Sequence, residues 1–513
     1  MSVRDAVRIA FIGAGSTVFA RVLLRDLFAL DDIGPLEIRL MDIDPERLRV
    51  TEAVARRLAQ EAAAGGRAPA RITSTMERRA ALEGADYVIC LVQIGGFRPA
   101  TVADFEIPKR YGLVQTIGDT LGIGGIMRGL RTIPFLRELA RDMRECCPDA
   151  WLFNYANPLA INQWALEDAG VKTVGLCHSV KRTARQLAGY VGVPFEKVEY
   201  QAAGINHMAF FLRFEAEGRD LYPELRAMVA EGRIPAHDRV RFEVLAHFAY
   251  FVSESSFHFA EYVPYFLRSD RPGAIERYQL PVDEYLRRCG VYEEQFNALR
   301  EEVDRAEREA PEHGGGTLAY GGSDPAHGSG DPAHRSGPVH GSGNVEHGSD
   351  TRAPGSAPRE VSANEPAGRP ASGPQSDEDV AWIIHSLETG QGRLLHANVR
   401  NAGAIENLPP DCIVEVPCYV DRSGLRPLRM GKLPAHLAAL IETNVNVQRL
   451  TVAAAYSGDP EAAKRAAMLD PRTAALLPLD QIASLVEELL QAHRQWLPQF
   501  RLPEPAARGA APA

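Results

Sequence analysis

The chain has 513 residues, of which 45% are hydrophobic and 24% are charged, with a formal net charge of −10 and a pI near 5.8. This composition is ordinary for a globular protein and leaves room for two or three domains or one large two-lobed enzyme. The acidic balance argues against a nucleic-acid partner, and no apolar run approaches the roughly 18–20 residues that a membrane span needs. The start of the chain shows no signal-peptide pattern, and the seven cysteines are too scattered for a disulfide framework. The sequence therefore predicts a cytoplasmic protein.

Residues 7–30 predict the first half of a dinucleotide-binding unit. An apolar strand over 7–12 leads into a glycine-containing turn, and a helix-like run follows over 18–30. Glycines allow the backbone to approach a pyrophosphate, which then rests on amide groups at the helix N-terminus. The turn residues expected to contact the nucleotide are Gly13, Gly15, Ser16 and Thr17. The third glycine of the GxGxxG fingerprint is missing because Val18 stands in its place, so the glycines alone are a weak signal.

A second strand, predicted over 36–41, ends at Asp42 and Asp44. A carboxylate at this distance after the glycines is where the ribose hydroxyls of a dinucleotide are held. The alternative is that one of these residues caps the helix that begins at Pro45. Strand, glycine turn, helix, strand and acid in this order favour dinucleotide binding.

Polar residues follow two further strand-like runs, over 85–92 and 151–154. The glycine-rich stretch 117–126 carries one carboxylate, Asp119, and is either a loop over a ligand or a plain cluster of turns. Asn157 is held extended by the proline that follows it, which suits an amide aimed at a nicotinamide or a sugar hydroxyl. Alternatively, Asn157 caps a helix that starts at Pro158.

Cys177 and His207 each follow an apolar, strand-like run. A thiolate and an imidazole at two such strand ends can jointly hold a borderline divalent metal such as Mn, Fe, Co, Ni or Zn. Two protein ligands leave positions open for substrate oxygens or water, which describes a catalytic metal. The alternative is that Cys177 is a small buried hydrophobe and His207 a core histidine, because no CxxC or HxxxH spacing supports a metal.

The stretch 250–265 is dense in acid–base side chains among aromatics, which suits a substrate pocket. From 311 to 378 the composition changes to Gly, Ser, Pro, Ala, His and Asp, so this stretch is predicted to be a disordered insertion. An amphipathic helix is expected from Asp379, then strands over 394–399 and 413–420, and helices over 434–500. The insertion is thus expected to interrupt a domain.

Taken together, these stretches resemble glycoside hydrolase family 4, and within it most closely the α-galactosidase (melibiase) branch. The resemblance rests on FIGAGSTVF, MDID, GDTLGIGGI, NYANP, GLCHSV, GINHMAF, SESSFHFAEYVPYF, HANVRNAGAIENLP and VEVPC. It implies an α/β fold with a Rossmann-like dinucleotide-binding domain over 1–176. An α+β domain similar to that of lactate and malate dehydrogenases would follow over 177–310 and 379–503.

The resemblance also implies a redox route to glycoside cleavage, with NAD and Mn²⁺ or another divalent transition metal as cofactors. NAD⁺ would take hydride from the sugar C3, and the metal on Cys177 and His207 would chelate the C2 and C3 oxygens. A tyrosinate-like base would then remove the C2 proton, and an acid would assist the leaving group. Water addition and return of the hydride would complete the cycle.

The resemblance assigns roles to some residues more firmly than to others, and Cys177 and His207 as metal ligands are the firmest. Asn157 matches a substrate-binding asparagine, and Asp119 a loop acid near the sugar. The base is placed at Tyr262 or Tyr265 without a choice between them. The acid is His178, where some relatives carry Asp, or Glu254. Ser179 and the lack of a basic cluster favour an unphosphorylated sugar.

Other functions stay open at this stage. An α-galacturonidase or α-glucosidase would use the same chemistry on another sugar, with Arg98 as a possible partner for a uronate. A different reaction class is an NAD-dependent hydroxy acid dehydrogenase, and a non-enzymatic alternative is a dinucleotide sensor or scaffold. The resemblance further implies a homodimer or homotetramer formed through the C-terminal helices, with a small glycoside as substrate.

Overall fold

The computed structural model describes residues 6–30, 32–309, 374 and 376–502. The insertion predicted over 311–378 lies outside this range except for its last positions. Described residues on both sides of it, up to Arg305 and from Pro374 onward, belong to one compact unit. The domain division predicted after residue 176 stays a prediction.

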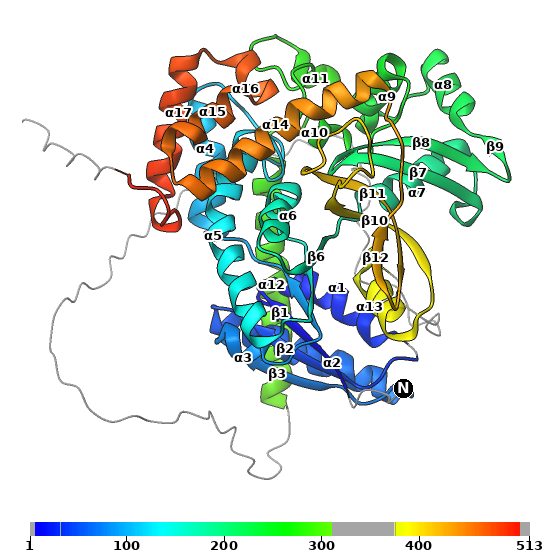
Figure 1. Cartoon of the computed structure of the whole chain (residues 1–513), viewed down its shortest axis with the longest axis vertical. Helices are drawn as coiled ribbons and strands as arrows, with labels where there is room; N and C mark the ends of the chain where they lie inside the picture. Colours follow the sequence, from blue (N-terminus) through cyan, green and yellow to red (C-terminus); the bar gives the residue numbers. More distant parts are fainter. Residues whose placement is uncertain (1–5, 31, 310–373, 375, 503–513) are drawn as a thin grey trace, which may run out of the picture. The chain divides into compact units, whose positions relative to one another are not determined.

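A 12-stranded sheet organises this unit, in the order β3-β2-β1-β4-β5-β6-β10-β11-β7-β8-β9, with β12 paired to β11 (Figure 1). The parallel part contains β1 (Val7–Ile12), β2 (Leu36–Met41), β3 (Arg71–Thr75), β4 (Tyr87–Cys90), β5 (Trp151–Asn154) and β6 (Lys172–Gly175). The antiparallel part contains β7 (Val198–Ile205), β8 (Met208–Ala216), β9 (Arg219–Asp220), β10 (Arg393–Arg400), β11 (Ile413–Asp421) and β12 (Gly424–Pro427). The order 3-2-1-4-5-6 of the parallel strands is that of a dinucleotide-binding fold. The α/β, Rossmann-like fold class predicted from the sequence is confirmed.

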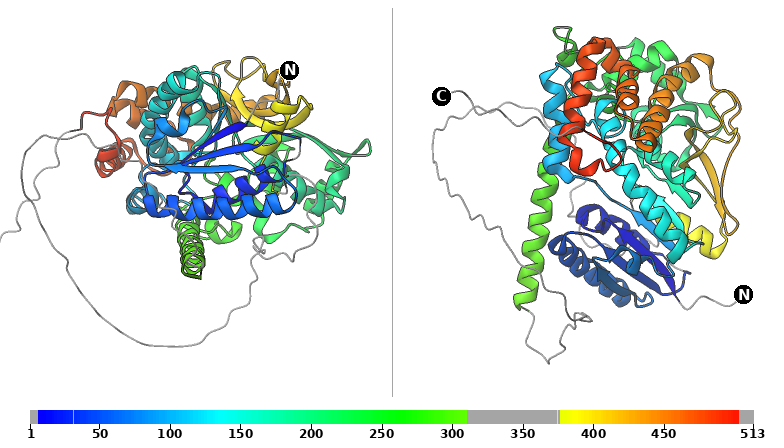
Figure 2. Two further views of the ribbon diagram at one scale, coloured as in Figure 1. Left: turned by 90° about the horizontal axis from the view of Figure 1, so that it is seen from below. Right: turned by 60° about the vertical axis from the view of Figure 1, so that its left-hand side comes forward.

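Helices cover both faces of the parallel part, with α1 and α2, in blue, along one side and the cyan helices α5 and α6 along the other (Figure 2). The helices of the first half are α1 (Thr17–Phe28), α2 (Pro45–Ala64), α3 (Arg78–Leu82), α4 (Val102–Arg110), α5 (Gly122–Cys146) and α6 (Leu159–Asp168). They continue with α7 (Ser179–Val191), α8 (Tyr222–Ala230), α9 (Arg239–Phe248), α10 (Ser256–Phe259), α11 (Ala274–Tyr278) and α12 (Glu284–Glu309). The last are α13 (Val380–Thr389), α14 (Ala435–Ser457), α15 (Pro460–Met468), α16 (Pro471–Leu476) and α17 (Leu479–Ala492). Among the described helices, none has both the length and the apolar character to cross a membrane.

Local sequence explains these elements. Four consecutive residues of β1, from Ile9 to Ile12, are buried, as expected for a strand covered on both faces. Helix α17 buries residues 482, 485, 486, 489 and 490, a spacing that places one apolar stripe against the core. Helix α2 begins at Pro45, whose fixed φ suits a first helical turn.

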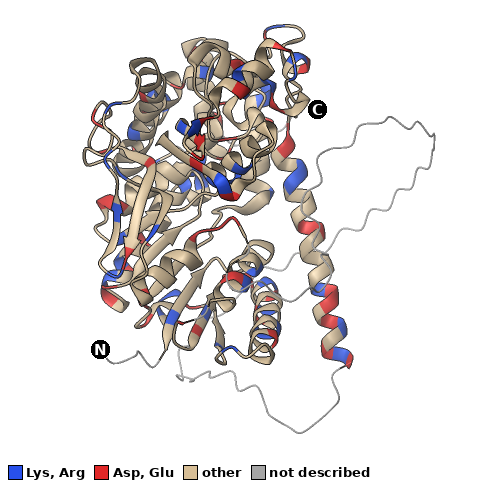
Figure 3. Cartoon of the chain, turned by 90° about the vertical axis from the view of Figure 1, so that its right-hand side faces the viewer, with Lys and Arg blue, Asp and Glu red and all other residues tan. Residues whose placement is uncertain are grey.

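Helix α12 carries charges of both signs along its length (Figure 3). Ion pairs between described residues join it to α2, among them Arg49 to Asp304, Arg57 to Glu302, and Arg300 to Glu46. These side chains are part exposed, so the pairs fix the register of the two helices more than they stabilise the fold.

One expectation needs correction. The glycine-rich stretch 117–126 is a loop only as far as Leu121, because helix α5 starts at Gly122. A Cβ on Gly124 would lie 2.1 Å from the carbonyl oxygen of Gly118, and one on Gly125 would lie 2.7 Å from that of Thr120. The glycines therefore let the first turn of α5 pack against the loop that holds Asp119.

Candidate active site

The turn between β1 and α1 offers backbone to a ligand. Gly13 has φ +90°, and a Cβ there would lie 2.9 Å from the backbone nitrogen of Val92, beyond β4. At Gly15 a Cβ would lie 2.7 Å from the carboxylate of Asp42. No side chain of the described residues caps the N-terminus of α1. Glycine therefore lets this turn (the glycine cradle) pack closely against Val92 and Asp42, next to the uncapped N-terminus of α1.

The other residues predicted at this edge have different surroundings. Asp42 accepts hydrogen bonds from the Gly15 amide at 2.6 Å and the Asp44 amide at 3.0 Å. Asp44 accepts from the amides of Glu46 and Arg47, so the capping alternative is correct for Asp44. Ser16 is exposed, whereas the buried Thr17 hydroxyl lies 2.8 Å from that of Thr51.

Asp119 and Asn157 are brought together. Asn157 Nδ2 donates to Asp119 Oδ2 at 2.9 Å, and the Thr120 hydroxyl donates to Asp119 Oδ1 at 2.7 Å. Helix α6 has no side-chain cap, so the capping alternative for Asn157 is wrong. A carboxylate and an amide paired in this way present directional groups suited to a polyhydroxylated ligand.

The loop that carries Asp119 is held in place by Glu261. The buried Glu261 carboxylate accepts three backbone hydrogen bonds, from the amides of Thr116, Ile117 and Gly118. Because each oxygen of this carboxylate is bonded, the loop is fixed to the segment that follows α10.

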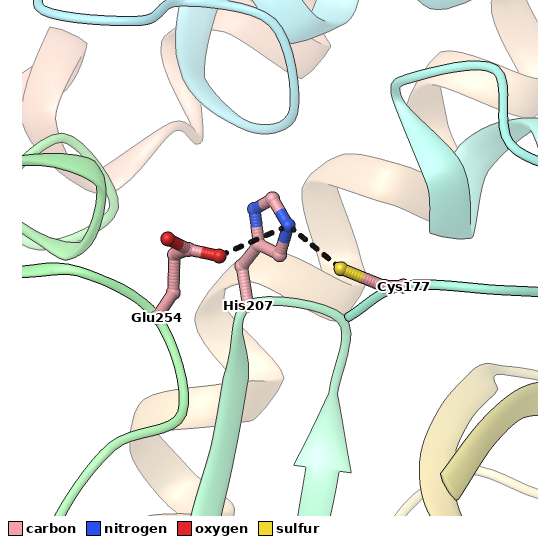
Figure 4. Close-up of side chains that lie close together, drawn as sticks. All are labelled: Cys177, His207 and Glu254. Carbon is pink, nitrogen blue, oxygen red and sulfur yellow. Dashed lines mark hydrogen bonds and ion pairs between the residues drawn. The ribbon is translucent and has the colours of Figure 1, made fainter. Parts of the chain in front are cut away.

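Cys177, His207 and Glu254 converge from three separate loops (Figure 4). Cys177 follows β6, His207 lies in the turn between β7 and β8, and Glu254 precedes α10. Cys177 Sγ lies 3.3 Å from His207 Nε2, and Glu254 Oε2 lies 3.3 Å from the same nitrogen. One ligand atom from each of the three residues lies within 4.8 Å of the other two. A sulfur, a nitrogen and an oxygen donor together suit a borderline divalent cation.

The backbone and a tyrosine set the orientation of the His207 ring. His207 has φ +66°, the left-handed region that a non-glycine residue adopts at a cost. Its Nδ1 shares a hydrogen bond of 3.0 Å with the hydroxyl of buried Tyr262. Nε2 is therefore the ring nitrogen that faces Cys177 and Glu254.

The pKa values of Cys177 and Glu254 are shifted in opposite directions. Burial raises the pKa of the Cys177 thiol to about 12, so a bound cation is needed to form the thiolate. Burial also raises the pKa of Glu254, but the charges of His258 and His207 outweigh it and place that pKa well below its ordinary value.

His178, directly after Cys177, contacts a residue outside the Cys177–His207–Glu254 cluster. Its Nδ1 lies 2.9 Å from the buried carboxylate of Glu378. Burial lowers the pKa of His178, but the hydrogen bond and charge of Glu378 outweigh it and raise the pKa to about 9. Neighbouring residues tie the same segment to α7, since Asp379 pairs with Lys181 at 3.1 Å and Asp377 pairs with Arg185.

Two residues singled out in the sequence lie apart from this cluster. Tyr265 is 50% exposed and packs on Phe248 and Phe266, and no described contact joins it to Cys177 or His207. Arg98 is exposed, with its guanidinium 4.4 Å from the centroid of the Phe97 ring.

A pocket reaches Cys177 from the side of α7, α13 and β10. Its polar and aromatic lining includes Lys181, Tyr200, Asp379, Trp382, Arg393 and His396. The Arg393 guanidinium lies 4.5 Å above the Trp382 ring, and the rings of Tyr200 and His396 stack 5.5 Å apart. Planar aromatic and charged groups are therefore arranged around an opening beside Cys177.

Three residues at the site were missed by the sequence analysis: His258, Glu261 and Glu378. His258 and Glu261 lie in the same acid- and aromatic-rich stretch as Glu254 and Tyr262, so density of acid–base groups was their only signal. Glu378 lies 200 residues after its partner His178, and the sequence placed it in the insertion.

Comparison with known proteins gives consistent matches over the chain. Residues 8–193 match the profile "Family 4 glycosyl hydrolase", and residues 202–473 match "Family 4 glycosyl hydrolase C-terminal domain". An alpha-galactosidase of Bacillus subtilis (strain 168) is 39% identical over 96% of this chain and 100% of its own length. An alpha-galactosidase of Rhizobium meliloti (strain 1021) is 33% identical over 96% of this chain and 89% of its own.

In fold, the chain is similar to the 6-phospho-beta glucosidase from Thermotoga maritima, solved with manganese, NAD⁺ and glucose-6-phosphate. That structure is 22% identical, with a TM-score of 0.69 over 96% of this chain and 99% of the other.

Proposed function

We propose that this chain, which belongs to the family 4 glycosyl hydrolases, hydrolyses terminal α-D-galactosides of the melibiose type with NAD and a divalent metal as cofactors. Both curated relatives named above are α-galactosidases, and the alignments extend over nearly the whole chain. The observation that carries the proposal is the convergence of Cys177, His207 and Glu254, with Asn157 after β5, the strand that pairs with β6. Hydride transfer alone does not require such a cluster, which argues against a hydroxy acid dehydrogenase.

The residues present fit both cofactors. The cradle formed by Gly13 and Gly15 suits a pyrophosphate, with Ser16, Thr17 and the helix amides around it. Asp42 or Asp44 is proposed to hold the ribose, and Asp42 is favoured because Asp44 caps α2. For the metal, Cys177 and His207 supply a thiolate and an imidazole that an ion such as Mn²⁺ accepts.

When bound, NAD would supply hydride transfer at the sugar C3, and a metal held by Cys177 and His207 would supply Lewis acidity. Asp119 and Asn157 are proposed to orient the sugar through its hydroxyl groups. Tyr262 or Tyr265 is proposed to accept the C2 proton, and the position of Tyr262 beside His207 favours it. His178 or Glu254 is proposed to protonate the leaving oxygen.

The proposal is tested by hydrolysis of p-nitrophenyl α-galactoside with and without NAD⁺, Mn²⁺ and a thiol reductant. The matching α-galacturonide, α-glucoside and β-galactoside serve as controls for the sugar. We expect turnover of the α-galactoside only when both cofactors are present. Activity on another sugar would keep the chemistry and change the specificity, whereas turnover without NAD⁺ and metal would overturn the proposal.

We also propose a cytoplasmic homodimer or homotetramer that forms through the C-terminal helices. Leu469, directly after α15, and Leu479, the first residue of α17, are 57% and 65% exposed, more than is usual for leucine. Sedimentation of the protein with Leu469→Lys and Leu479→Lys tests this, with dissociation expected. A monomeric wild-type protein would contradict it.

A further inference from the structure

We propose that Glu254 is a third protein ligand of the metal and that His258 is the residue that positions it. This inference rests on the proposed metal-dependent function. It goes beyond that function by assigning to one of the two candidate acids a place on the metal, and by giving a role to His258.

The two oxygens of Glu254 have different surroundings. Oε1 accepts a hydrogen bond from the Ser255 amide at 2.8 Å and lies 2.9 Å from His258 Nδ1. Oε2 points the other way, toward His207 Nε2 at 3.3 Å. One oxygen is therefore engaged by the protein, and the second is presented to the donor atoms of His207 and Cys177. This division is typical of a ligating carboxylate whose outer oxygen is held by hydrogen bonds.

The Glu254 side chain is also enclosed. It is 14% exposed, and that of His207 is 6% exposed, so the two groups meet out of bulk water. A carboxylate at such a place is costly unless a cation compensates it. Among the described residues, this trio is the one group whose ligand atoms come together in this way.

His258 is fixed in turn by its own neighbours. Its Nδ1 lies 2.9 Å from the Ser255 hydroxyl, and its ring stacks on Phe257 with a centroid distance of 5.2 Å. The centroids of the His258 and His207 rings lie 5.3 Å apart, and each ring contacts one oxygen of the carboxylate. The orientation of Glu254 is therefore set before any ligand arrives, which lowers the entropy cost of binding a cation.

The assignment has a consequence for the chemistry. A carboxylate that holds the metal cannot also deliver a proton to the leaving oxygen, so the inference removes Glu254 from the two candidate acids. Three protein ligands still leave positions open for substrate oxygens, as a catalytic metal requires.

The test is metal affinity, measured apart from turnover. Chelator-treated full-length protein is titrated with Mn²⁺, and the free ion is followed by electron paramagnetic resonance. Cys177→Ala reports whether the site exists, and Glu254→Gln and His258→Gln report the inference. We expect Glu254→Gln to weaken Mn²⁺ binding more than about 100-fold, and His258→Gln roughly 10–100-fold, as for groups that orient ligands. Glu378→Gln, which removes a nearby carboxylate bonded to His178, is the matched control and should leave the affinity within about twofold.

A second readout is the visible spectrum of the Co²⁺-loaded protein, which responds to the number and type of ligands. Glu254→Gln should change this spectrum, and Glu254→Asp, which keeps the carboxylate, should bind Mn²⁺ more tightly than Glu254→Gln. Circular dichroism of each variant checks that it folds. If Cys177→Ala weakens binding and Glu254→Gln does not, the inference is wrong and the metal site stands. If neither variant changes the affinity, the proposed metal-dependent function itself fails.

Discussion

The nucleotide edge and the metal cluster lie on the same sheet but are built in different ways. The nucleotide edge comes from one continuous segment, from β1 to Asp44, and offers mainly backbone amides. The metal cluster comes from loops around residues 177, 207 and 254, and offers only side chains. A binding site made of backbone amides needs residues without bulky side chains, such as glycine, next to the ligand. A site made of side chains depends instead on which donor atoms the fold brings together. Substitutions should therefore affect the two regions independently.

The largest effect is expected from Cys177→Ala. Loss of the thiolate should reduce kcat/KM for p-nitrophenyl α-galactoside on the order of 1,000-fold, more than the loss of a group that only orients a ligand. NAD affinity, measured by fluorescence, should change little because the cradle is formed elsewhere. Cys418→Ala, at a buried cysteine of β11, is the control and should lower stability while activity is kept. Equal losses in both variants would mean that Cys177 acts through packing.

The next effect separates the two candidate bases. Tyr262→Phe removes the hydroxyl that bonds His207 Nδ1, so Mn²⁺ affinity should fall roughly 10–100-fold. Tyr265→Phe should leave the affinity within about twofold, because this ring is half exposed and packs on phenylalanines. A Tyr262→Phe protein that binds Mn²⁺ normally but loses kcat would assign Tyr262 to proton transfer alone.

A smaller effect is expected at the nucleotide edge. The new Cβ of Gly15→Ala would meet the Asp42 carboxylate, a side chain that can move, so the chain should fold with about tenfold weaker NAD binding. Mn²⁺ affinity should not change. Gly189→Ala is the control, since a Cβ there meets nothing within 4 Å, and it should raise the free energy of unfolding by about 0.5–1 kcal/mol. Weaker Mn²⁺ binding in Gly15→Ala would show that the two regions are coupled.

The same contrast explains what could be predicted from the sequence. The strands and helices from β1 to α2 follow from apolar runs, glycines and a proline within a few residues of each other, so the fold class was accessible. Cys177 and His207 could be singled out by their places after strands, but Glu254 could not be joined to them. The distance between these residues is set by the turn after β7 and the loop before α10, and neither has a periodic pattern.

Single residues show the same limit. Asp42 and Asp44 were interchangeable in sequence, and only the loop geometry shows that Asp44 caps α2 and that Asp42 bonds Gly15. The partner of His178 is Glu378, the last residue of the predicted insertion, in a stretch whose composition concealed it. Local chemistry thus identifies residue types, and the fold decides which of them meet.

The smallest effect concerns the loop that carries Asp119. Glu261→Gln replaces a carboxylate that accepts three amide hydrogen bonds by a group with one acceptor oxygen and an NH₂ that faces N–H donors. The free energy of unfolding, measured with urea, should fall by about 1–3 kcal/mol, since buried donors lose their partner. Because this loop holds Asp119 against Asn157, KM should rise while NAD and Mn²⁺ affinities are kept. Glu243→Gln, where the carboxylate bonds Tyr278 and Arg277 instead of backbone, should cost less than about 1 kcal/mol. A Glu261→Gln protein with normal stability and a raised KM would mean that Glu261 contacts the substrate, which would make this loop a third part of the site.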